Sequence, residues 1–377
     1  MKLTSDILQY VDNHAQEALD LLMELGKIPA PSNHEEKRAE FCKQWLEKQG
    51  AQGVYIDDAL NVVYPVGCTE DNPLVVFMAH TDVVFPDTEE LPMRVEDGKL
   101  YCPGIGDDTL HLVALLMCAK YVAENKLVPA GCGMLLIANS GEEGLGNLKG
   151  TRKIMEQFGS RIKEFITFDG PGTNIVNKAV GSKRYKVEID TEGGHSYSRF
   201  GNRNAIAYLA SLIDTLYTMK VPQRGRTTYN VGTISGGTSV NTIAQHAEML
   251  YEFRSDDRED LAEMEAHFNA ALAFYRTKGI QVTCTLVGDR PCGIEIDPDK
   301  HNDLIVRAAA AIETHRGVTP KLGSGSTDCN IPLSMGIPSI MVPCGLGAGA
   351  HTREEYIVID SQVPGIKMAF ELILHYM

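Results

Sequence analysis

Short, continuously apolar segments alternate with longer amphipathic segments through most of the chain. Continuous apolar runs are typical of strands buried on both faces of a parallel sheet, and amphipathic runs are typical of the helices that cover it. We therefore predict strands over residues 61–66, 74–79, 133–139, 164–168 and 338–343. Helices are predicted over residues 108–124, 146–158, 300–315 and 361–376. This order predicts an α/β fold with a mostly parallel sheet sandwiched by helices.

Two further helices are predicted before the first strand. Apolar residues recur at helical spacing over 7–25, and this helix should end at Gly26. The second helix should begin at Ser32, where Glu35 three residues later gives a capping-box pattern, and it should end at Gly50.

The pattern changes between residues 183 and 291. Apolar and charged residues alternate strictly over 183–190, which indicates a sheet with one face in water. The order that follows is helix, strand, strand, helix, strand, so the whole segment has the ferredoxin-like order. We therefore predict that an α+β ferredoxin-like domain, residues 183–291, is inserted into an α/β domain formed by residues 1–182 and 292–377.

Composition and charge narrow the classes of partner. The 377 residues carry a net charge of −15, which argues against nucleic acid and anionic membrane as partners. No apolar run approaches the roughly 20 residues that a membrane helix needs, and we expect no signal peptide. The nine cysteines contain no C-x-x-C pair, so we expect free thiols in a reducing cytoplasm.

Polar residues of metal-ligand type follow several of the predicted strands. Each has an ordinary explanation when taken alone, such as a helix N-terminal acid, a solvated turn or a loop histidine. Together they should converge beyond the carboxyl ends of one sheet, where unpaired carboxylates would repel one another strongly unless cations bind. These residues are His80, Asp82, Asp107, Asp108, Glu142, Glu143, Asp169 and His351.

Imidazole and carboxylate together suit zinc, or manganese or cobalt in a less selective site. Two histidines and three carboxylates are too many protein ligands for one catalytic zinc, which usually keeps three. They fit two divalent metals about 3.5–4 Å apart that share a bridging carboxylate.

The motifs resemble those of the co-catalytic dizinc metallopeptidases, the family of tripeptidase (peptidase T), glutamate carboxypeptidase, aminoacylase and carnosinase. The resemblance covers nearly the whole chain, with all five motifs in order, and is closest to the peptidase T-like aminopeptidase branch. The motifs are "HTD" at 80–82, "PGIGDDTLH" at 103–111, the pair at 142–143, Asp169 and "GAHT" at 349–352. The resemblance implies two divalent metal ions, with zinc as the expected metal. Their ligands would be His80, Asp107 as the bridging ligand, Glu143, Asp169 and His351.

The same resemblance implies roles for residues that hold no metal. Glu142 would be the general base that works with a metal-bridging hydroxide, and Asp82 would orient the His80 ring. A cis peptide bond would follow Asp107. The inserted domain would be a lid and dimerisation domain whose His195 contacts the substrate carbonyl, from the opposite subunit in dimeric members. Substrate-binding roles would fall to Asn241, Arg254 and Asn330.

Two positions depart from the pattern of the family. Thr109-Leu110 stands where Lys-Gly is usual after the aspartate pair, and Ala244 stands where proline is usual. The first change affects the helix behind the bridging ligand rather than the ligands themselves.

Three functions are compatible with these motifs. The leading one is an exopeptidase that hydrolyses short peptides, as an aminopeptidase or a di- or tripeptidase, because family members with Asp at position 169 tend to act on a free N-terminus. The second is a deacylase of N-acyl amino acids, which has the same chemistry and a different pocket. A non-enzymatic binding protein is the third, but binding alone does not need a base such as Glu142. We also expect a homodimer formed through the lid domain.

Overall fold

The computed structural model describes residues 2–377 and divides the chain into two compact units. The first unit comprises Met1–Ala179 and Ile294–Met377, and the second comprises Val180–Gly293. The second unit is therefore an insertion into the first.

An eight-stranded sheet forms the centre of the first unit. Strands β6, β3, β7 and β16 are neighbours and run parallel, β8 and β15 are parallel to each other, and the pairs β1–β2, β2–β6 and β16–β8 are antiparallel. The prediction of a mostly parallel sheet is confirmed. In spatial order the strands are β1 (Tyr55–Ile56), β2 (Val62–Val66), β6 (Gly133–Asn139), β3 (Leu74–His80), β7 (Ile162–Phe168), β16 (Ser339–Val342), β8 (Ile175–Ala179) and β15 (Leu322–Gly325).

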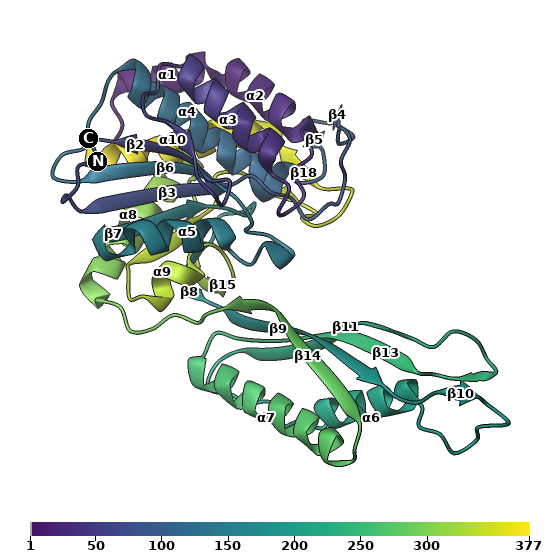
Figure 1. The fold of residues 1–377 in the computed structure, drawn as a ribbon. Coiled ribbons are helices and arrows are strands. Elements are labelled where there is room, and N and C mark those ends of the chain that lie inside the picture. The colour runs from purple at the N-terminus through teal and green to yellow at the C-terminus, as the bar shows by residue number, and fades with distance from the viewer. Residues whose placement is uncertain (1) are drawn as a thin grey trace. The chain divides into compact units, whose positions relative to one another are not determined.

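Helices cover both faces of this sheet (Figure 1). The larger core lies on the face covered by α1 (Ser5–Asn13), α2 (Ala15–Lys27), α3 (Glu36–Lys48), α4 (Leu110–Glu124), α8 (Pro298–Arg316) and α10 (Gln362–Ile373). The smaller core lies under α5 (Lys149–Phe158) and α9 (Asn330–Ser334). The central strands β3 and β6 are buried along their whole length, which explains their continuous apolar sequences.

The N-terminal segment differs from the prediction in two ways. The first predicted helix is two helices, α1 and α2, because the backbone leaves helical geometry at His14 (φ −103°, ψ 12°). The second predicted helix begins at Glu36 rather than at Ser32. The capping-box prediction at Ser32 was therefore wrong, and its hydroxyl group bonds elsewhere, as described below.

A small antiparallel sheet, which the sequence pattern did not predict, brings two distant loops together. Its strands are short and partly exposed, so they carry no clear apolar period. They are β17 (Gly347–Ala348), β18 (Tyr356–Val358), β5 (Lys99–Tyr101) and β4 (Arg94–Glu96), in that order. Pairing of β18 with β5 places the segment that contains His351 beside the segment that leads to Asp107.

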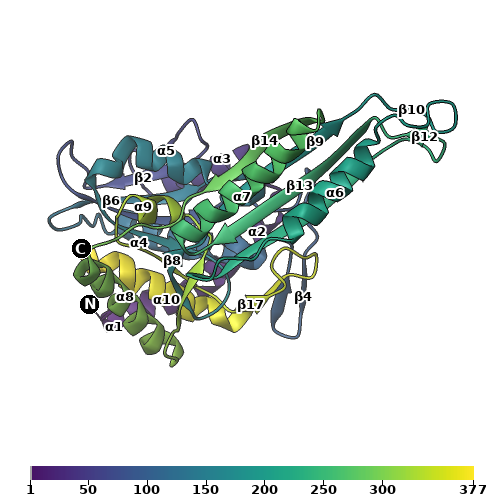
Figure 2. The same cartoon turned by 90° about the horizontal axis from the view of Figure 1, so that it is seen from below.

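The second unit has the predicted ferredoxin-like order, β9 (Gly181–Asp190), α6 (Ala205–Tyr217), β11 (Thr227–Gly236), β13 (His246–Ser255), α7 (Arg258–Thr277) and β14 (Gln281–Arg290). Its antiparallel sheet has the order β11-β13-β9-β14, and α6 and α7 pack on one face (Figure 2). A two-stranded ribbon, β10 (Gly194–His195) with β12 (Thr242–Ile243), extends from the end of the sheet where β9 stops and β13 starts.

Within residues 2–377, every helix is too short or too polar to span a bilayer.

Candidate metal centre

The carboxyl ends of neighbouring parallel strands meet at one edge of the eight-stranded sheet. His80 is the last residue of β3 and lies in register with Asn139, the last residue of β6. Asp169 follows β7 directly, and Glu142 and Glu143 lie in the turn after β6. Ligands bind beyond this edge in sheets of this kind. Strand order alone therefore brings three of the predicted ligands to one place.

Asp107 lies between the two predicted histidine ligands. Its Oδ1 is 3.1 Å from Nε2 of His80, and its Oδ2 is 3.3 Å from Nε2 of His351. The His80 Nε2 is also 3.7 Å from Oδ1 of Asp169, and the His351 Nε2 is 3.0 Å from Oε1 of Glu143. The five predicted ligands thus form a continuous chain of contacts with Asp107 at its centre, as a bridging carboxylate requires.

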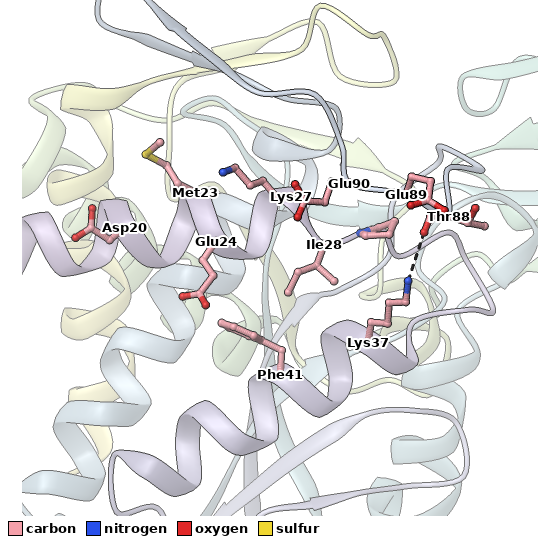
Figure 3. A pocket seen from close by; sticks show the side chains of 11 residues that line it. Asp20, Met23, Glu24, Lys27, Ile28, Lys37, Phe41, Thr88, Glu89 and Glu90 are labelled. Atoms are coloured by element: carbon pink, nitrogen blue, oxygen red, sulfur yellow. Dashed lines mark hydrogen bonds between the residues drawn. The ribbon is translucent and has the colours of Figure 1, made fainter.

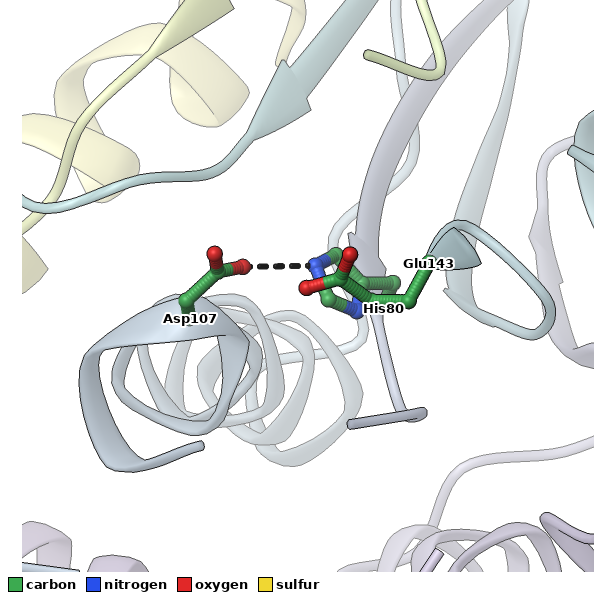
Figure 4. A group of neighbouring side chains, drawn as sticks. All are labelled: His80, Asp107 and Glu143. Atoms are coloured by element: carbon green, nitrogen blue, oxygen red, sulfur yellow. Dashed lines mark hydrogen bonds and ion pairs between the residues drawn. The ribbon is translucent and has the colours of Figure 1, made fainter. Parts of the chain in front are cut away.

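The donor atoms lie close enough to share bound cations. One ligand atom each from His80, Asp107 and Glu143 lies within 4.8 Å of the others, and the same holds for His80, Asp108 and Asp169. Figure 4 shows the first group, whose side chains point toward one another from three separate segments. Imidazole nitrogen with carboxylate oxygen on both sides is a donor set that suits zinc and other first-row divalent metals. The residues present therefore fit the metal that the motifs imply.

The electrostatics of the cluster also favour a bound cation. Burial raises the pKa of Glu143 and of Asp169, even though each faces an imidazole. Burial also acts to raise the pKa of Asp107, but its contacts with His351 and His80 outweigh this, and its pKa lies below the ordinary value. Hydrogen bonds with Asp107 and Glu143 raise the pKa of His351 to about 10. The carboxylates thus raise the pKa of His351, which means that they favour positive charge where the ligand atoms meet.

The loop that carries Asp107 is held by a carboxylate that sequence reasoning missed. Glu355, only 1% exposed, accepts the backbone N–H groups of Gly104, Gly106 and Asp107 at 2.9, 2.8 and 2.9 Å. Gly104 has φ +75°, and a Cβ there would lie 2.2 Å from a methyl carbon of Val83, so the turn needs glycine. The sequence offered little signal for Glu355 beyond its position four residues after His351.

Asp82 holds the turn that contains the glutamate pair. Its Oδ1 accepts the N–H of Glu142 at 3.0 Å, and its Oδ2 accepts the N–H of Glu143 at 2.9 Å and the hydroxyl of Ser32 at 2.6 Å. Its Oδ1 is 3.5 Å from Nδ1 of His80, whereas that nitrogen is 3.0 Å from the Asp82 backbone oxygen. Asp82 therefore fixes the position of the glutamates at least as directly as it orients the His80 ring.

Asp108 is not one of the five predicted ligands, although one of its oxygens lies within 4.8 Å of ligand atoms of His80 and Asp169. Its Oδ2 accepts the backbone N–H of His80 at 2.7 Å, and its Oδ1 is 2.8 Å from Nδ1 of the buried His111. The peptide bond between Asp107 and Asp108 is cis, as the resemblance implied. Asp108 thus joins the end of β3 to the start of α4.

Asn330 lies in a buried turn beside another carboxylate that the motifs did not identify. Its Oδ1 accepts the N–H of Thr327 at 2.9 Å. Asp328 in the same turn accepts hydrogen bonds from Asn139 Nδ2, at 2.7 Å, and from the Thr151 hydroxyl. Burial raises the pKa of Asp328 to about 6. Its contact with Asn139 links this turn to the carboxyl end of β6.

The predicted residues of the inserted unit lie at opposite ends of its sheet. His195 is on the ribbon opposite Thr242, and the carbonyl oxygen of Asn241 accepts the N–H of Ser196 at 2.9 Å. Arg254 lies near the other end of β13, where its guanidinium contacts Glu252 at 3.0 Å. The structure therefore brings His195 and Asn241 together but leaves Arg254 apart from both.

Solved structures with the same fold include several peptidases. The chain matches a tripeptidase from Staphylococcus aureus with a TM-score of 0.76 and 22% identity over 95% of this chain and 97% of that one. It matches aminopeptidase PepT from Bacillus cereus with a TM-score of 0.72 and 21% identity over 95% and 98% of the two chains. A metallo-carboxypeptidase from Sulfolobus solfataricus matches with a TM-score of 0.76 and 17% identity over 96% and 99%. These likenesses establish the fold.

Similar sequences include an uncharacterised protein and a desuccinylase. An uncharacterised Bacillus subtilis protein, YqjE, is 24% identical over 94% of this chain and 97% of its own length. A succinyl-diaminopimelate desuccinylase from Methylobacillus flagellatus is 25% identical over 80% of this chain and 83% of its own length.

The family itself is shown by a match to the model of peptidase family M20/M25/M40, which covers residues 76–375. That range includes the eight-stranded sheet from β3 onward, all five predicted ligands and the whole inserted unit. The resemblance read from the motifs is confirmed, and the chain belongs to peptidase family M20/M25/M40.

Proposed function

We propose that the protein is a metal-dependent exopeptidase that hydrolyses short peptides, as an aminopeptidase or a di- or tripeptidase. The observation that carries this proposal is the position of Asp107 between His80 and His351, with Asp169 and Glu143 at the two ends of the chain of contacts. This is the arrangement expected of a site for two metals that share one carboxylate.

The residues around the ligands have the roles that amide hydrolysis needs. Two divalent cations, with zinc as the expected metal, would activate the attacking water and polarise the scissile carbonyl. Glu142, which is 5% exposed and adjacent to the ligand Glu143, takes the proton of that water and returns it to the leaving amine. Asp82 keeps Glu142 in place through its backbone N–H.

The geometry of the inserted unit supports a homodimer in which His195 acts on the partner's substrate. Arg254 lies eight residues along β13 from His246, which is roughly 27 Å at the usual rise of a strand. The ribbon with His195 lies beyond His246, whereas a tripeptide spans at most about 11 Å. One short peptide therefore cannot contact both Arg254 and His195 of the same chain. In a dimer, one chain could supply Arg254 and its partner could supply His195 to the same substrate.

A deacylase is the second candidate, and the similarity to succinyl-diaminopimelate desuccinylases favours it. The chemistry at the metals would be the same, because both substrates present an amide carbonyl. The difference would lie on the acyl side of the scissile bond, which is a residue with a free α-amine in a peptide and an acyl group in an N-acyl amino acid.

One assay separates the candidates. Metal-free protein is loaded with zinc, manganese or cobalt and offered a panel of di- and tripeptides and of N-acyl amino acids, and the release of free amine is measured. Turnover of unblocked peptides supports the exopeptidase. Turnover of N-acyl amino acids with inert peptides supports the deacylase, and no turnover of either class contradicts both.

A further inference from the structure

Arg38 is the largest side chain buried without measurable exposure in the described part of the chain, and it lies directly behind the metal centre. It comes from α3, a helix whose sequence reads as an ordinary amphipathic surface helix. Burying a cation is costly unless hydrogen bonds or opposite charges compensate it. Among the described residues, no carboxylate oxygen forms a salt bridge with the Arg38 guanidinium. Interactions other than a direct ion pair must therefore offset the cost of burying the Arg38 charge.

The guanidinium donates hydrogen bonds to three segments of the chain. Its Nε donates to the carbonyl of Ile28, at 2.8 Å. Its Nη1 donates to the carbonyl of Thr81, at 2.9 Å, and to the hydroxyl oxygen of Thr109, at 3.2 Å. The Thr109 hydroxyl in turn donates to the carbonyl of Gly104, at 2.6 Å.

Two of these contacts fix metal-site segments relative to each other. Thr81 lies between the ligand His80 and the turn-holding Asp82, and Thr109 follows the Asp107-Asp108 pair. One guanidinium nitrogen thus sets the distance between the segment that carries one histidine ligand and the segment that carries the bridging carboxylate. Small changes in that distance matter, because a shared carboxylate must reach both metals at once.

The charge of Arg38 also acts on the site. Burial lowers the pKa of the guanidinium, while the nearby thiols of Cys102 and Cys42 and the carboxylates of Asp82 and Asp108 act to raise it. Arginine stays protonated in proteins, so a fixed positive charge lies behind a cluster of buried carboxylates. That charge offsets part of the repulsion between the carboxylates before any metal binds.

We propose that Arg38 is a positioning residue of the metal centre, which holds the His80–Asp82 and Asp107–Thr109 segments in register and keeps the carboxylate cluster ready to take up metal. The proposal rests on the metal site within the proposed function, but not on the choice of substrate. It predicts that loss of Arg38 weakens metal binding itself, in addition to any effect on stability.

The neighbouring Lys37 provides a matched control. It carries the same charge on the same helix but lies at the surface, on the rim of a groove of about 620 Å³ between α2 and α3 (Figure 3). Its Nζ donates to the carbonyl of Thr88, at 3.4 Å, away from the ligands. Ile28, whose carbonyl accepts from Arg38, also lines this groove.

The test uses the full-length protein and measures zinc binding to the metal-free form by calorimetric titration. The variants are Arg38→Met, Arg38→Lys and Lys37→Met, and thermal melting with and without zinc is recorded for each. We expect Arg38→Met to weaken zinc binding by about 10–100-fold, the range for residues that support metal ligands. Arg38→Lys should recover part of this loss, because it restores the charge but cannot donate in the same fork geometry. Lys37→Met should match the wild type.

Several outcomes would overturn the proposal. Wild-type zinc affinity in Arg38→Met, with only a lower melting temperature, would show that Arg38 serves the core alone. If Arg38→Met does not fold, wild-type zinc affinity and kcat in Arg38→Lys would overturn it equally. An equal loss of affinity in Lys37→Met would show that general surface charge is responsible. Wild-type protein that binds zinc but cleaves no peptide would refute the proposed function and leave the role of Arg38 intact.

Discussion

Glu355 accepts the backbone N–H of Asp107 over a distance of 2.9 Å, so a carboxylate that holds no metal fixes the residue placed to bridge two metals. Replacing Glu355 by Gln removes the negative charge and leaves one acceptor oxygen for three N–H donors. We expect metal affinity to fall by about 10–100-fold, as is usual when a group that supports a ligand is lost. Metal titration of the purified variant measures this.

The adjacent Glu354 gives the control for that experiment. Its side chain is 72% exposed and contacts Arg94, so Glu354→Gln should bind metal like the wild type. Unchanged metal affinity in Glu355→Gln would show that the backbone of this loop holds its shape without the carboxylate.

The two histidines should each support metal binding. His80→Ala removes the imidazole that faces Asp107 and Asp169, and His351→Ala removes the one that faces Asp107 and Glu143. We expect each variant to retain less metal than the wild type, as measured by elemental analysis after dialysis, and to lose activity with it. The exposed His34 offers a control substitution in the same unit. Full metal occupancy in either variant would mean that the ligands are misplaced.

Substitution of Glu142 should leave the metal content unchanged, unlike substitution of a metal ligand. We expect Glu142→Ala to bind metal like the wild type while kcat falls by about 10²–10⁴-fold, because the change removes a base and leaves the ligand set intact. Parallel measurement of bound metal and of kcat tests both statements. Loss of metal together with activity would make Glu142 a ligand, and retained activity would exclude it as the base.

The sheet, and the placement of the candidate ligands at the ends of its strands, could be predicted because they depend on patterns local in sequence. Continuous apolar runs identified β3 and β6, and a polar residue at the end of such a run marked His80. Residues whose side chains bond to backbone atoms gave no such signal in the sequence. Glu355 accepts hydrogen bonds from three backbone N–H groups, and Arg38 donates to two carbonyls and one hydroxyl.

Ser32 shows that a local motif can also predict a contact that does not form. Its spacing to Glu35 fits a capping box, but the hydroxyl bonds to Asp82, fifty positions away, and helix α3 begins later. A local motif and a long-range hydrogen bond compete for the same side chain, and only the folded chain reveals which one forms. The short strands β4, β5, β17 and β18 were missed for a related reason. Their sheet depends on the pairing of β18 with β5, two segments far apart in the sequence, rather than on the composition of each strand.

The homodimer prediction can be tested by complementation. His195→Ala and Glu142→Ala subunits are each expected to be inactive, but a mixture should regain activity if His195 serves the partner's site. Recovery should approach about a quarter of the wild-type value, since half of the dimers are hybrids and each hybrid has one intact site. A mixture of Glu142→Ala with Glu143→Gln should stay inactive, because both changes affect the same metal site. A monomer by light scattering, or no recovery of activity in the first mixture, contradicts a role for His195 in the active site of the partner subunit.

The last prediction concerns the substrate and rests on Asp169. An aspartate at this position is one methylene shorter than a glutamate, so it would hold its metal nearer to β7 and would leave more room on the open side of the site. We expect that room to accept a free α-amine, with Arg254 of one subunit and Asn241 of its partner holding the C-terminal side of the peptide. Acetylation of the N-terminus of a good di- or tripeptide substrate should therefore abolish turnover, as measured by release of the second residue. Asp169→Glu should lower kcat/KM for the free peptide while metal remains bound, because the ligand is kept and the space is reduced. Efficient cleavage of N-acetyl amino acids by the wild type, with the unblocked peptides inert, would instead assign the protein to the deacylases.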